Sequence, residues 1–317
     1  MIQAPKVSII IACREIDLYT RECFAACLEH QEVPSEIIVL PDRAENKSDF
    51  DSALKIVPTG KVKPAAKRNQ GVRLSQGRVV AFIDSDALPA AGWLANACHH
   101  LEEPVAGCVG GPNLNPADDS FLQKASGDVY ATYLAMGKFH IRYRVAKPQD
   151  APELPSCNLI VKRDAFEEAG GFDESILTGE DAKLCFQIRA LGKRVLYRPD
   201  VVVFHHRRPL FLPHARQVWQ YAVDKSKIYH TVHGLQKWYY WSPTLLIAGI
   251  TLCAIGSFIA ATATICRSLL LLYLILCFGE GVLRSIPRSL AIGAGIVVTH
   301  FAYGLGFVAG LLRAKEE

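Results

Sequence analysis

The sequence of 317 residues carries little excess charge: 35 lysines and arginines stand against 31 aspartates and glutamates, a formal net charge of +4. A nucleic-acid-binding protein normally needs a strong basic surplus to neutralise phosphates, so this balance argues against a nucleic acid as partner. The chain is not short of apolar residues, which make up 50% of it. That fraction excludes a disordered or acidic-tail protein.

A second shortage is of charge toward the C-terminal end, between residues 242 and 312. The charged residues of this stretch are Arg267, Glu280, Arg284 and Arg288. A membrane-spanning helix needs about 20 mostly apolar residues, so we expect three spans here. They are residues 242–265, 268–286 and 289–312. The earlier residues have an ordinary polar composition, and the overall apolar fraction therefore combines a soluble body with a membrane tail.

The sequence also lacks any Cys-x-x-Cys pair, although it has ten cysteines. This absence argues against a zinc ribbon, and buried, reduced thiols in a cytosolic domain are the simpler interpretation. The apolar run Val7–Ala12 is too short for a signal peptide and is typical of a strand. We therefore expect the soluble part of the chain to stay in the cytoplasm.

Buried-strand patterns alternate with helix-like stretches in the first part of the chain. Val7–Ala12, Glu36–Leu40 and Val79–Ile83 are continuous apolar runs rich in β-branched residues, as in the strands of a parallel sheet. Helix-like stretches separate them, so the pattern predicts an α/β domain with a mostly parallel, Rossmann-like sheet. Ligands of such sheets bind beyond the carboxyl ends of the strands, which are therefore the places to search for a site.

Acidic residues follow two of these strands. Asp84 and Asp86 come after Val79–Ile83, and the alternation of an extended chain puts them on one side. Two carboxylates so placed can hold Mg²⁺ or Mn²⁺, which in turn binds phosphate oxygens. A solvated turn is the alternative, since Asp and Ser suit turns. Asp42 follows Glu36–Leu40 in the same way and is a candidate hydrogen-bond acceptor for a base or a ribose.

Further candidates lie later in the chain. Glu180 and Asp181 open a predicted helix, where a general base would be held rigidly, although the helix dipole favours acids there in any case. His205 follows a predicted strand and is a candidate third metal ligand. Arg207 and Arg208 suit phosphate recognition, and a basic patch beside the membrane is a second interpretation that is compatible with the first.

Six sequence pieces, taken in order between residues 6 and 235, resemble the family 2 glycosyltransferases. The pieces are VSIIIACRE, EIIVLPD, KPAAKRNQGVRLSQGRVVAFIDSDALP, GGPN, SCNLIVKRDAFEEAGGFDE and GEDAKLCFQIRALGKRVLYRPDVVVFHH. The resemblance implies the GT-A nucleotide-sugar fold, a mixed sheet flanked by helices. We place this catalytic domain at residues 1–209.

The donor site implied by the resemblance uses a metal and several charged residues. Asp84 and Asp86 match an Asp-x-Asp motif whose Mg²⁺ or Mn²⁺ bridges the diphosphate of a nucleoside-diphosphate sugar, expected to be a UDP-sugar. His205 matches a late histidine that adds a metal ligand. The remaining matches are Asp42 to an acid that contacts the nucleobase, Arg68 to a basic residue near the nucleotide, and Arg207 and Arg208 to cations at the diphosphate.

The reaction implied by the resemblance is a single displacement that inverts the sugar. Asp181 matches the general base of a Glu-Asp motif that begins with Glu180, and it would deprotonate the acceptor hydroxyl. The metal and the arginines would stabilise the leaving diphosphate. Processive synthases carry a Gln-x-x-Arg-Trp motif that residues 216–221 lack, so we expect transfer of one sugar. Pro41 stands where the family often has another acid, which weakens the match around Asp42.

A membrane location is indicated by the residues before the apolar stretch. Residues 210–241 mix aromatic and apolar residues with basic ones, as in a helix lying on a membrane surface, so we expect an amphipathic interface segment there. A membrane domain then covers residues 242–317, with self-association through its helices as a further expectation. The expected acceptor is a lipid-linked glycan at the cytoplasmic face of a bacterial inner membrane. Under the positive-inside rule, the basic C-terminus fits an even number of spans better than three.

Two other functions stay open on the sequence alone. An enzyme of the same type would glycosylate polyprenyl phosphate itself, and the mass of the lipid product would separate this reaction from transfer to a glycan. A catalytically inactive, nucleotide-binding scaffold of the membrane is the alternative outside enzymes. The sequence does not identify the sugar, for whose pocket Asn113, Cys157 and Asn158 are candidate lining residues.

Overall fold

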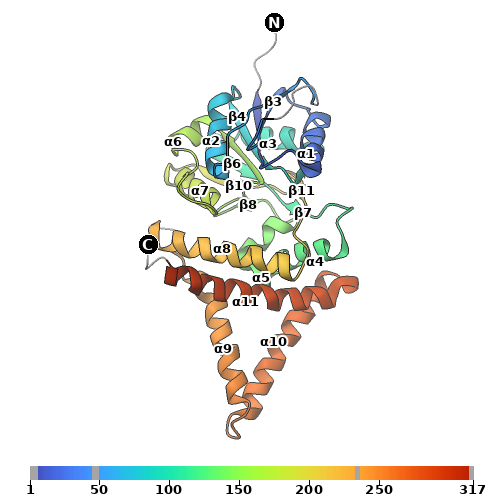
Figure 1. Cartoon of the computed structure of the whole chain (residues 1–317), viewed down its shortest axis with the longest axis vertical. Coiled ribbons are helices and arrows are strands. Elements are labelled where there is room, and N and C mark those ends of the chain that lie inside the picture. Colours follow the sequence, from blue (N-terminus) through green and yellow to red (C-terminus); the bar gives the residue numbers. More distant parts are fainter. Residues whose placement is uncertain (1–5, 45–49, 233–235, 314–317) are drawn as a thin grey trace. The chain divides into compact units, whose positions relative to one another are not determined.

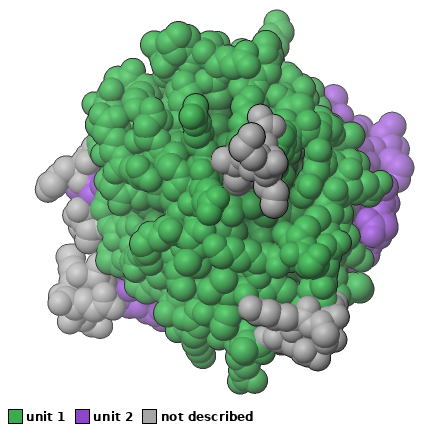
Figure 2. All heavy atoms as spheres, turned by 90° about the horizontal axis from the view of Figure 1, so that it is seen from above, with its two compact units in different colours: residues 1–114, 144–206 green, residues 115–143, 207–317 purple. Residues whose placement is uncertain are grey.

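The computed structural model of the chain describes residues 6–44, 50–232 and 236–313. The chain divides into two compact units, which Figure 2 colours separately. The first consists of Met1–Leu114 and Arg144–His206, and the second of Asn115–Tyr143 and Arg207–Glu317. The first unit carries the sheets, whereas the second is helical.

An eight-stranded sheet forms the centre of the first unit (Figure 1). Its strands in spatial order are β3 (Leu54–Ile56), β2 (Ser35–Leu40), β1 (Val7–Ala12), β4 (Val79–Asp84), β9 (Asn158–Lys162), β6 (Ala106–Gly110), β10 (Arg194–Tyr197) and β8 (Gln149–Asp150). β1 runs parallel to β2 and β4, whereas β9 runs antiparallel to β4 and β6, so the sheet is mixed. A smaller sheet has the order β5 (Ala87–Pro89), β11 (Val203–His205) and β7 (Asn113–Leu114).

The helices of the first unit connect these strands. They are α1 (Leu18–Glu29), α2 (Pro64–Leu74), α3 (Trp93–His100), α6 (Arg163–Glu168) and α7 (Glu180–Ala190). The three apolar runs that predicted strands are β1, β2 and β4, and Pro199 lies between the end of β10 and the start of β11. Proline lacks a backbone donor, so a ladder cannot continue through it.

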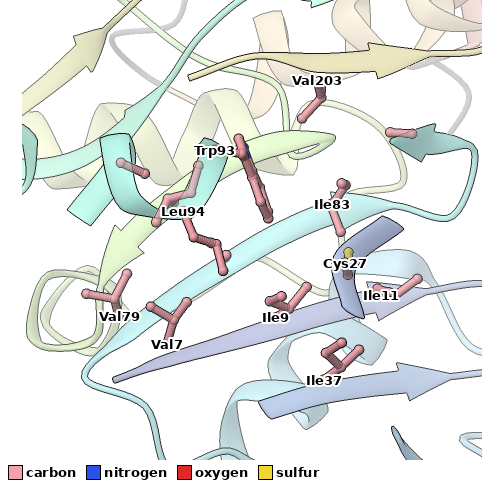
Figure 3. Packing of buried hydrophobic residues seen from close by; sticks show 14 of the residues in the cluster. Val7, Ile9, Ile11, Cys27, Ile37, Val79, Ile83, Trp93, Leu94 and Val203 are labelled. Atoms are coloured by element: carbon pink, nitrogen blue, oxygen red, sulfur yellow. The ribbon is translucent and has the colours of Figure 1, made fainter. Parts of the chain in front are cut away.

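The core of the first unit packs on both faces of the sheet. Ile9 and Ile11 of β1 face a cluster that includes Trp93 of α3 (Figure 3). Burying each such side chain contributes about 2 kcal/mol. Ile10 faces the other side of the sheet. A Cβ added to Gly71 of α2 would lie 2.6 Å from Cγ2 of Ile10. The glycine thus lets α2 approach β1 closely, and this approach fixes the helix that carries two residues of the candidate site.

The second unit is built from helices with a long apolar C-terminal part. Its elements are α4 (Phe121–Tyr130), α5 (Tyr133–Met136), the 3₁₀ helix η2 (Gly137–Tyr143), α8 (Leu212–Thr231), the 3₁₀ helix η3 (Trp238–Trp241), α9 (Ser242–Gly256), α10 (Ala263–Arg284), the 3₁₀ helix η4 (Ile286–Arg288) and α11 (Ser289–Arg313). Three stretches are long and apolar enough to cross a membrane: Trp238–Gly256, Ala263–Arg284 and Ile286–Arg313.

Two boundaries differ from the expectations. α9 ends at Gly256, short of the expected residue 265, because the chain turns there and Thr262 Oγ1 donates a hydrogen bond to the Gly256 carbonyl at 2.8 Å. Residues 115–143 belong to the helical unit, although we assigned them to the domain of residues 1–209. They join it because α4 packs on α11, where a Cβ on Gly295 would lie 2.6 Å from Val129.

Candidate active site

The three residues expected to bind a metal converge in the first unit. Asp84 ends β4, Asp86 lies in the turn to β5, and His205 ends β11. β11 pairs antiparallel with β5, and this register sets His205 opposite Ala87, the residue after Asp86. His205 Nε2 lies 3.0 Å from Asp86 Oδ1, and one ligand atom from each of the three residues lies within 4.8 Å of the others. Two carboxylates and an imidazole therefore meet in one place.

Arg68 connects this cluster to the Glu-Asp motif. From α2, its Nη2 donates to Asp84 Oδ1 at 2.8 Å and its Nη1 donates to Glu180 Oε1 at 2.7 Å. The side chain is buried, which by itself lowers the pKa of the guanidinium, but Asp84 and Glu180 outweigh burial and raise it. Arg68 is therefore a fixed positive charge between two acids that belong to different motifs.

Glu180 and Asp181 have different surroundings although they are neighbours. Gly179, which precedes α7, has a φ of +97°, a left-handed conformation that suits glycine and lets the helix begin directly at Glu180. Glu180 is buried, and this burial together with the charge of Asp181 raises its pKa to about 7, although Arg68 opposes the shift. Asp181 is half-buried, and its Oδ2 accepts a hydrogen bond from the backbone N–H of Ser156 at 3.2 Å.

Asp42 is held by a residue that the sequence analysis missed. Lys67 of α2 is 3% exposed, and its ammonium donates to Asp42 Oδ1, to the Leu40 carbonyl at 3.2 Å and to the Cys13 carbonyl. These carbonyls lie at the carboxyl ends of β2 and β1, so one lysine ties both strand ends to the acid expected at the nucleobase. Lys67 stands beside Arg68 in the sequence, and only the packing of α2 distinguishes their roles.

The structure does not place every candidate with this cluster. Arg207 and Arg208 belong to the second unit, where the Arg207 guanidinium lies over the rings of Tyr143 and Tyr130, 4.9 and 5.9 Å from their centroids. Their role at a diphosphate stays a prediction. Asn158, a candidate for the sugar pocket, uses its side chain within the protein instead.

The amide of Asn158 is fully buried between structural partners. Its Oδ1 accepts a hydrogen bond from Trp93 Nε1 at 2.9 Å, and its Nδ2 donates to the Val201 carbonyl at 2.8 Å. These contacts join α3, β9 and the segment before β11. Asn158 therefore has a structural explanation that does not involve a sugar.

The family is decided by comparison with known sequences. The family model described as "Glycosyltransferase like family 2" matches residues 5–228, which cover every site residue named above. The chain belongs to this family. Both the family and the mixed, helix-flanked GT-A sheet expected from the sequence are confirmed.

Individual relatives share smaller parts of the chain. A pre-mycofactocin glycosyltransferase of Mycobacterium tuberculosis is 31% identical over 146 residues, which are 46% of this chain and 30% of the relative. This chain thus spans less than a third of that relative. A glucosyl-dolichyl phosphate glucuronosyltransferase of Haloferax volcanii is 22% identical over 229 residues, 63% of this chain and 69% of the relative.

A solved structure extends the likeness in fold. It is a mannosyltransferase of Pyrobaculum calidifontis in complex with GDP-Man and Mn²⁺, with a TM-score of 0.59 and 18% sequence identity. The match covers 95% of this chain and 87% of the mannosyltransferase. At this identity the likeness concerns the fold alone.

Proposed function

We propose that this family 2 enzyme transfers one sugar from a nucleoside-diphosphate sugar to a lipid-linked glycan, with inversion and with a divalent metal. The observation that carries the proposal is the convergence of Asp84, Asp86 and His205 beside an Arg68–Glu180 pair. A nucleotide-binding scaffold needs neither a cluster of metal-binding side chains nor an acid of raised pKa beside that cluster. Perturbed acids next to a candidate metal site are typical of catalysis.

The donor set fits Mg²⁺ or Mn²⁺. Carboxylate oxygens are preferred by both ions, and the imidazole of His205 is accepted by Mn²⁺. Asp84, Asp86 and His205 would hold the ion, which when bound neutralises charge on the donor diphosphate. The Pyrobaculum mannosyltransferase of similar fold was solved with Mn²⁺ and a nucleotide sugar, which supports this assignment.

Asp181 is the better candidate for the general base. Glu180 is buried and engaged by Arg68, and with a pKa of about 7 it is only partly ionised at neutral pH. Asp181 is half-buried, and its Oδ2 accepts a hydrogen bond from the backbone N–H of Ser156, which fixes the carboxylate at the start of α7. In the proposed step Asp181 removes the proton of the acceptor hydroxyl as that oxygen attacks the anomeric carbon. The bond to the diphosphate breaks in the same displacement, and the configuration inverts.

The nucleotide is proposed to bind at the ends of β1 and β2. Asp42, fixed by Lys67, would accept hydrogen bonds from the base, and the cations Arg207 and Arg208 would approach the diphosphate. A UDP-sugar is our working choice of donor. A base-reading acid alone does not distinguish uracil from guanine, because both bases offer N–H donors.

The acceptor is proposed to be lipid-linked because the catalytic unit is joined to apolar helices. Three stretches are long and apolar enough to cross a membrane, and residues 212–231 form a helix directly before them. The Haloferax relative is named for a glucosyl-dolichyl phosphate, a lipid-linked sugar. We place the enzyme in a bacterial inner membrane with its catalytic unit in the cytoplasm, where it has access to nucleotide sugars. Self-association through the helices remains part of the proposal.

Mass spectrometry of the lipid product tests the proposed reaction. The purified full chain is supplied with Mn²⁺, a panel of nucleotide sugars and lipid acceptors that are either glycosylated diphospholipids or plain polyprenyl phosphate. The proposal expects one added sugar on the glycosylated acceptor and free nucleoside diphosphate. A sugar on polyprenyl phosphate would instead establish the second candidate, a polyprenyl-phosphate glycosyl synthase. Unchanged lipids of both kinds, with every donor, would contradict both.

A further inference from the structure

Hydropathy alone treats the last three apolar helices alike, but they are not alike in the structure. Nearly half (44%) of the apolar window of α11 is buried inside the protein, against 11% for α10. Large side chains project outward along much of α10, where Leu271, Ile275 and Leu283 are 59%, 57% and 86% exposed. The outward-facing surface that a lipid-embedded helix needs is therefore that of α10 and its neighbour α9, which joins it in a hairpin (Figure 1).

α11 is packed lengthwise against α8. A Cβ on Gly295 would lie 2.9 Å from Leu210, just before α8, and one on Gly306 would lie 2.9 Å from the Trp219 carbonyl. Near its end, a Cβ on Gly310 would lie 2.7 Å from the Val223 carbonyl. The contacts advance together along both helices, which therefore run parallel and in contact over about 20 Å at 1.5 Å per residue. Figure 1 shows the two helices side by side.

The sequence of α8 excludes it from a hydrocarbon core. It contains Arg216, Asp224, Lys225 and Lys227. Arg216 is exposed and lies six residues after Leu210, opposite about the middle of α11. If α11 crossed the membrane, this arginine would be carried to the bilayer centre, where a charged side chain is costly.

The bases of the hairpin legs also meet α11 at two separate places. A Cβ on Gly293 would lie 2.5 Å from Phe278, near the end of α10, and one on Gly304 would lie 2.9 Å from Pro243, at the start of α9. Phe307 packs on Trp241, with ring centroids 5.3 Å apart, in the run of aromatic residues before α9. α11 thus touches the near ends of both legs, as expected of a helix lying across the hairpin base.

We propose that only α9 and α10 cross the bilayer and that α11 lies with α8 in the headgroup layer. Arg267, near the hairpin turn, donates to the Ser257 carbonyl at 2.9 Å, and Arg284 ends α10. The helix rises about 25 Å from Arg267 to Arg284, and the two arginine side chains can reach both interfaces of a core about 30 Å thick. The end of α11 then lies on the same side as α8, and the chain connects the sheet-bearing unit to α8 through residues 207–211. That placement satisfies the positive-inside rule.

The test is protease accessibility in sealed vesicles whose outer side carries the sheet-bearing unit, verified by digestion of that unit. An epitope appended after the last residue requires no change inside the fold, and we expect protease to remove it without detergent. A second chain carries the epitope between Ala260 and Ala261 in the turn, where we expect it to survive until detergent is added. A protected C-terminal epitope would overturn the in-plane α11, and a turn epitope digested without detergent would overturn the spanning hairpin.

A separate observation concerns two arginines and one buried acid in the same unit. Arg284 Nε donates to Asp128 Oδ1 at 3.2 Å, and Arg288 Nε donates to Asp128 Oδ2 at 2.7 Å. The Asp128 side chain is 6% exposed, whereas those of the arginines are 32% and 26% exposed. Within the described part of the chain the terminal nitrogens of both guanidiniums make no hydrogen bond, so the cluster keeps one net positive charge and an open set of donors.

We infer that Arg284 and Arg288 bind the phosphate of a membrane lipid. Two guanidiniums held by Nε present their remaining N–H groups as forks, the geometry that matches phosphate oxygens, and one phosphate monoanion neutralises the excess charge. Asp128 acts here as a positioning residue, because it orients both side chains from α4. The phosphate can come from an anionic bulk phospholipid or from a phosphorylated lipid acceptor, and the inference does not depend on the proposed reaction.

Native mass spectrometry of the full chain, released from lipid nanodiscs, tests this site. The discs contain phosphatidylcholine alone, with phosphatidylglycerol, or with a polyprenyl phosphate. We expect the wild type to retain phosphatidylglycerol or polyprenyl phosphate, and the arm with greater retention names the source. The double variant Arg284→Gln, Arg288→Gln should lose about tenfold or more of that retention.

Asp128→Asn is the matched control for this experiment. It breaks the same ion pairs but keeps both arginines, which lose only their positioning, so retention of the lipid should fall less than in the double variant. Equal loss in Asp128→Asn and in the double variant would mean that the cluster is only a structural ion pair. Equal retention by the wild type and the double variant, with all three disc compositions, would also overturn the inference.

Discussion

Glu180 offers the sharpest test of the electrostatics of the site. Burial and the charge of Asp181 raise its pKa from 4.5 to about 7, in spite of the opposing charge of Arg68. Because one pKa unit corresponds to about 1.4 kcal/mol, ionising this carboxyl in the folded protein costs about 3 kcal/mol more than in the unfolded chain. The cost makes the free energy of unfolding depend on pH.

The direction of the dependence follows from proton linkage. Below pH 4.5 the carboxyl of Glu180 is protonated in both states and has no effect. As the pH rises from there to about 7, the folded protein keeps a proton that the unfolded chain has released, so stability falls. Above about pH 7 both forms are ionised, and the full cost of about 3 kcal/mol is present.

The variant Glu180→Gln cannot ionise and should lack this part of the pH dependence. Relative to the wild type, its free energy of unfolding should increase by up to about 3 kcal/mol between pH 4.5 and about pH 8. Thermal unfolding in detergent, followed by tryptophan fluorescence at several pH values, measures the difference. A difference between variant and wild type that stays constant with pH would refute the reasoning.

Asp173 supplies a control of opposite sign. Hydrogen bonds from Lys183 and Ser175 lower its pKa from 3.8 to about 2. The stabilising contribution of its ionised form is therefore present above pH 3.8 and is lost only as the pH falls toward 2. Asp173→Asn should accordingly show a constant difference from the wild type over the range in which Glu180→Gln changes.

Three further substitutions test separate parts of the account. Asp86→Asn should weaken Mn²⁺ binding by about tenfold or more in calorimetry, because one of three ligands is lost. Asp200→Asn breaks another Asp–His pair and should leave Mn²⁺ binding unchanged. Lys67→Met should lower the free energy of unfolding by about 2 kcal/mol and weaken donor binding in titrations, since it leaves strand-end carbonyls and a carboxylate unpaired. Gly179→Ala should cost about 1 kcal/mol or more in thermal unfolding, because its φ of +97° is strained for alanine.

Local sequence patterns predicted much of the structure of the first unit. The apolar runs of β1, β2 and β4 were sufficient to predict buried strands, and strand ends were sufficient to single out Asp84 and Asp86. The meeting of these acids with His205 depends on β11 pairing with β5, which no local pattern records. His205 was a candidate ligand because it follows a predicted strand, and the resemblance to a family supported that choice.

Other features depend on tertiary packing and were not predicted. Lys67 looks like any helix-surface lysine in the sequence, and only the approach of α2 to β1 buries its ammonium against two strand ends. The short strand β8 consists of two polar residues, Gln149 and Asp150, so it has no apolar signature. α11 is apolar enough to resemble a membrane span. Its proposed position in the headgroup layer follows from its contacts with α8, which the sequence does not reveal.

The most direct test of the central claim compares binding and turnover in wild type and Asp181→Asn. The full chain is titrated with the sugar nucleotide that stabilises it most in the presence of Mn²⁺, and release of nucleoside diphosphate with a lipid-linked acceptor is measured on the same samples. We expect Asp181→Asn to bind the donor nearly as well as the wild type and to lose transfer, and chelation of the metal to abolish both donor binding and transfer. Near wild-type turnover in Asp181→Asn, or transfer that persists without a divalent ion, would contradict the proposed mechanism.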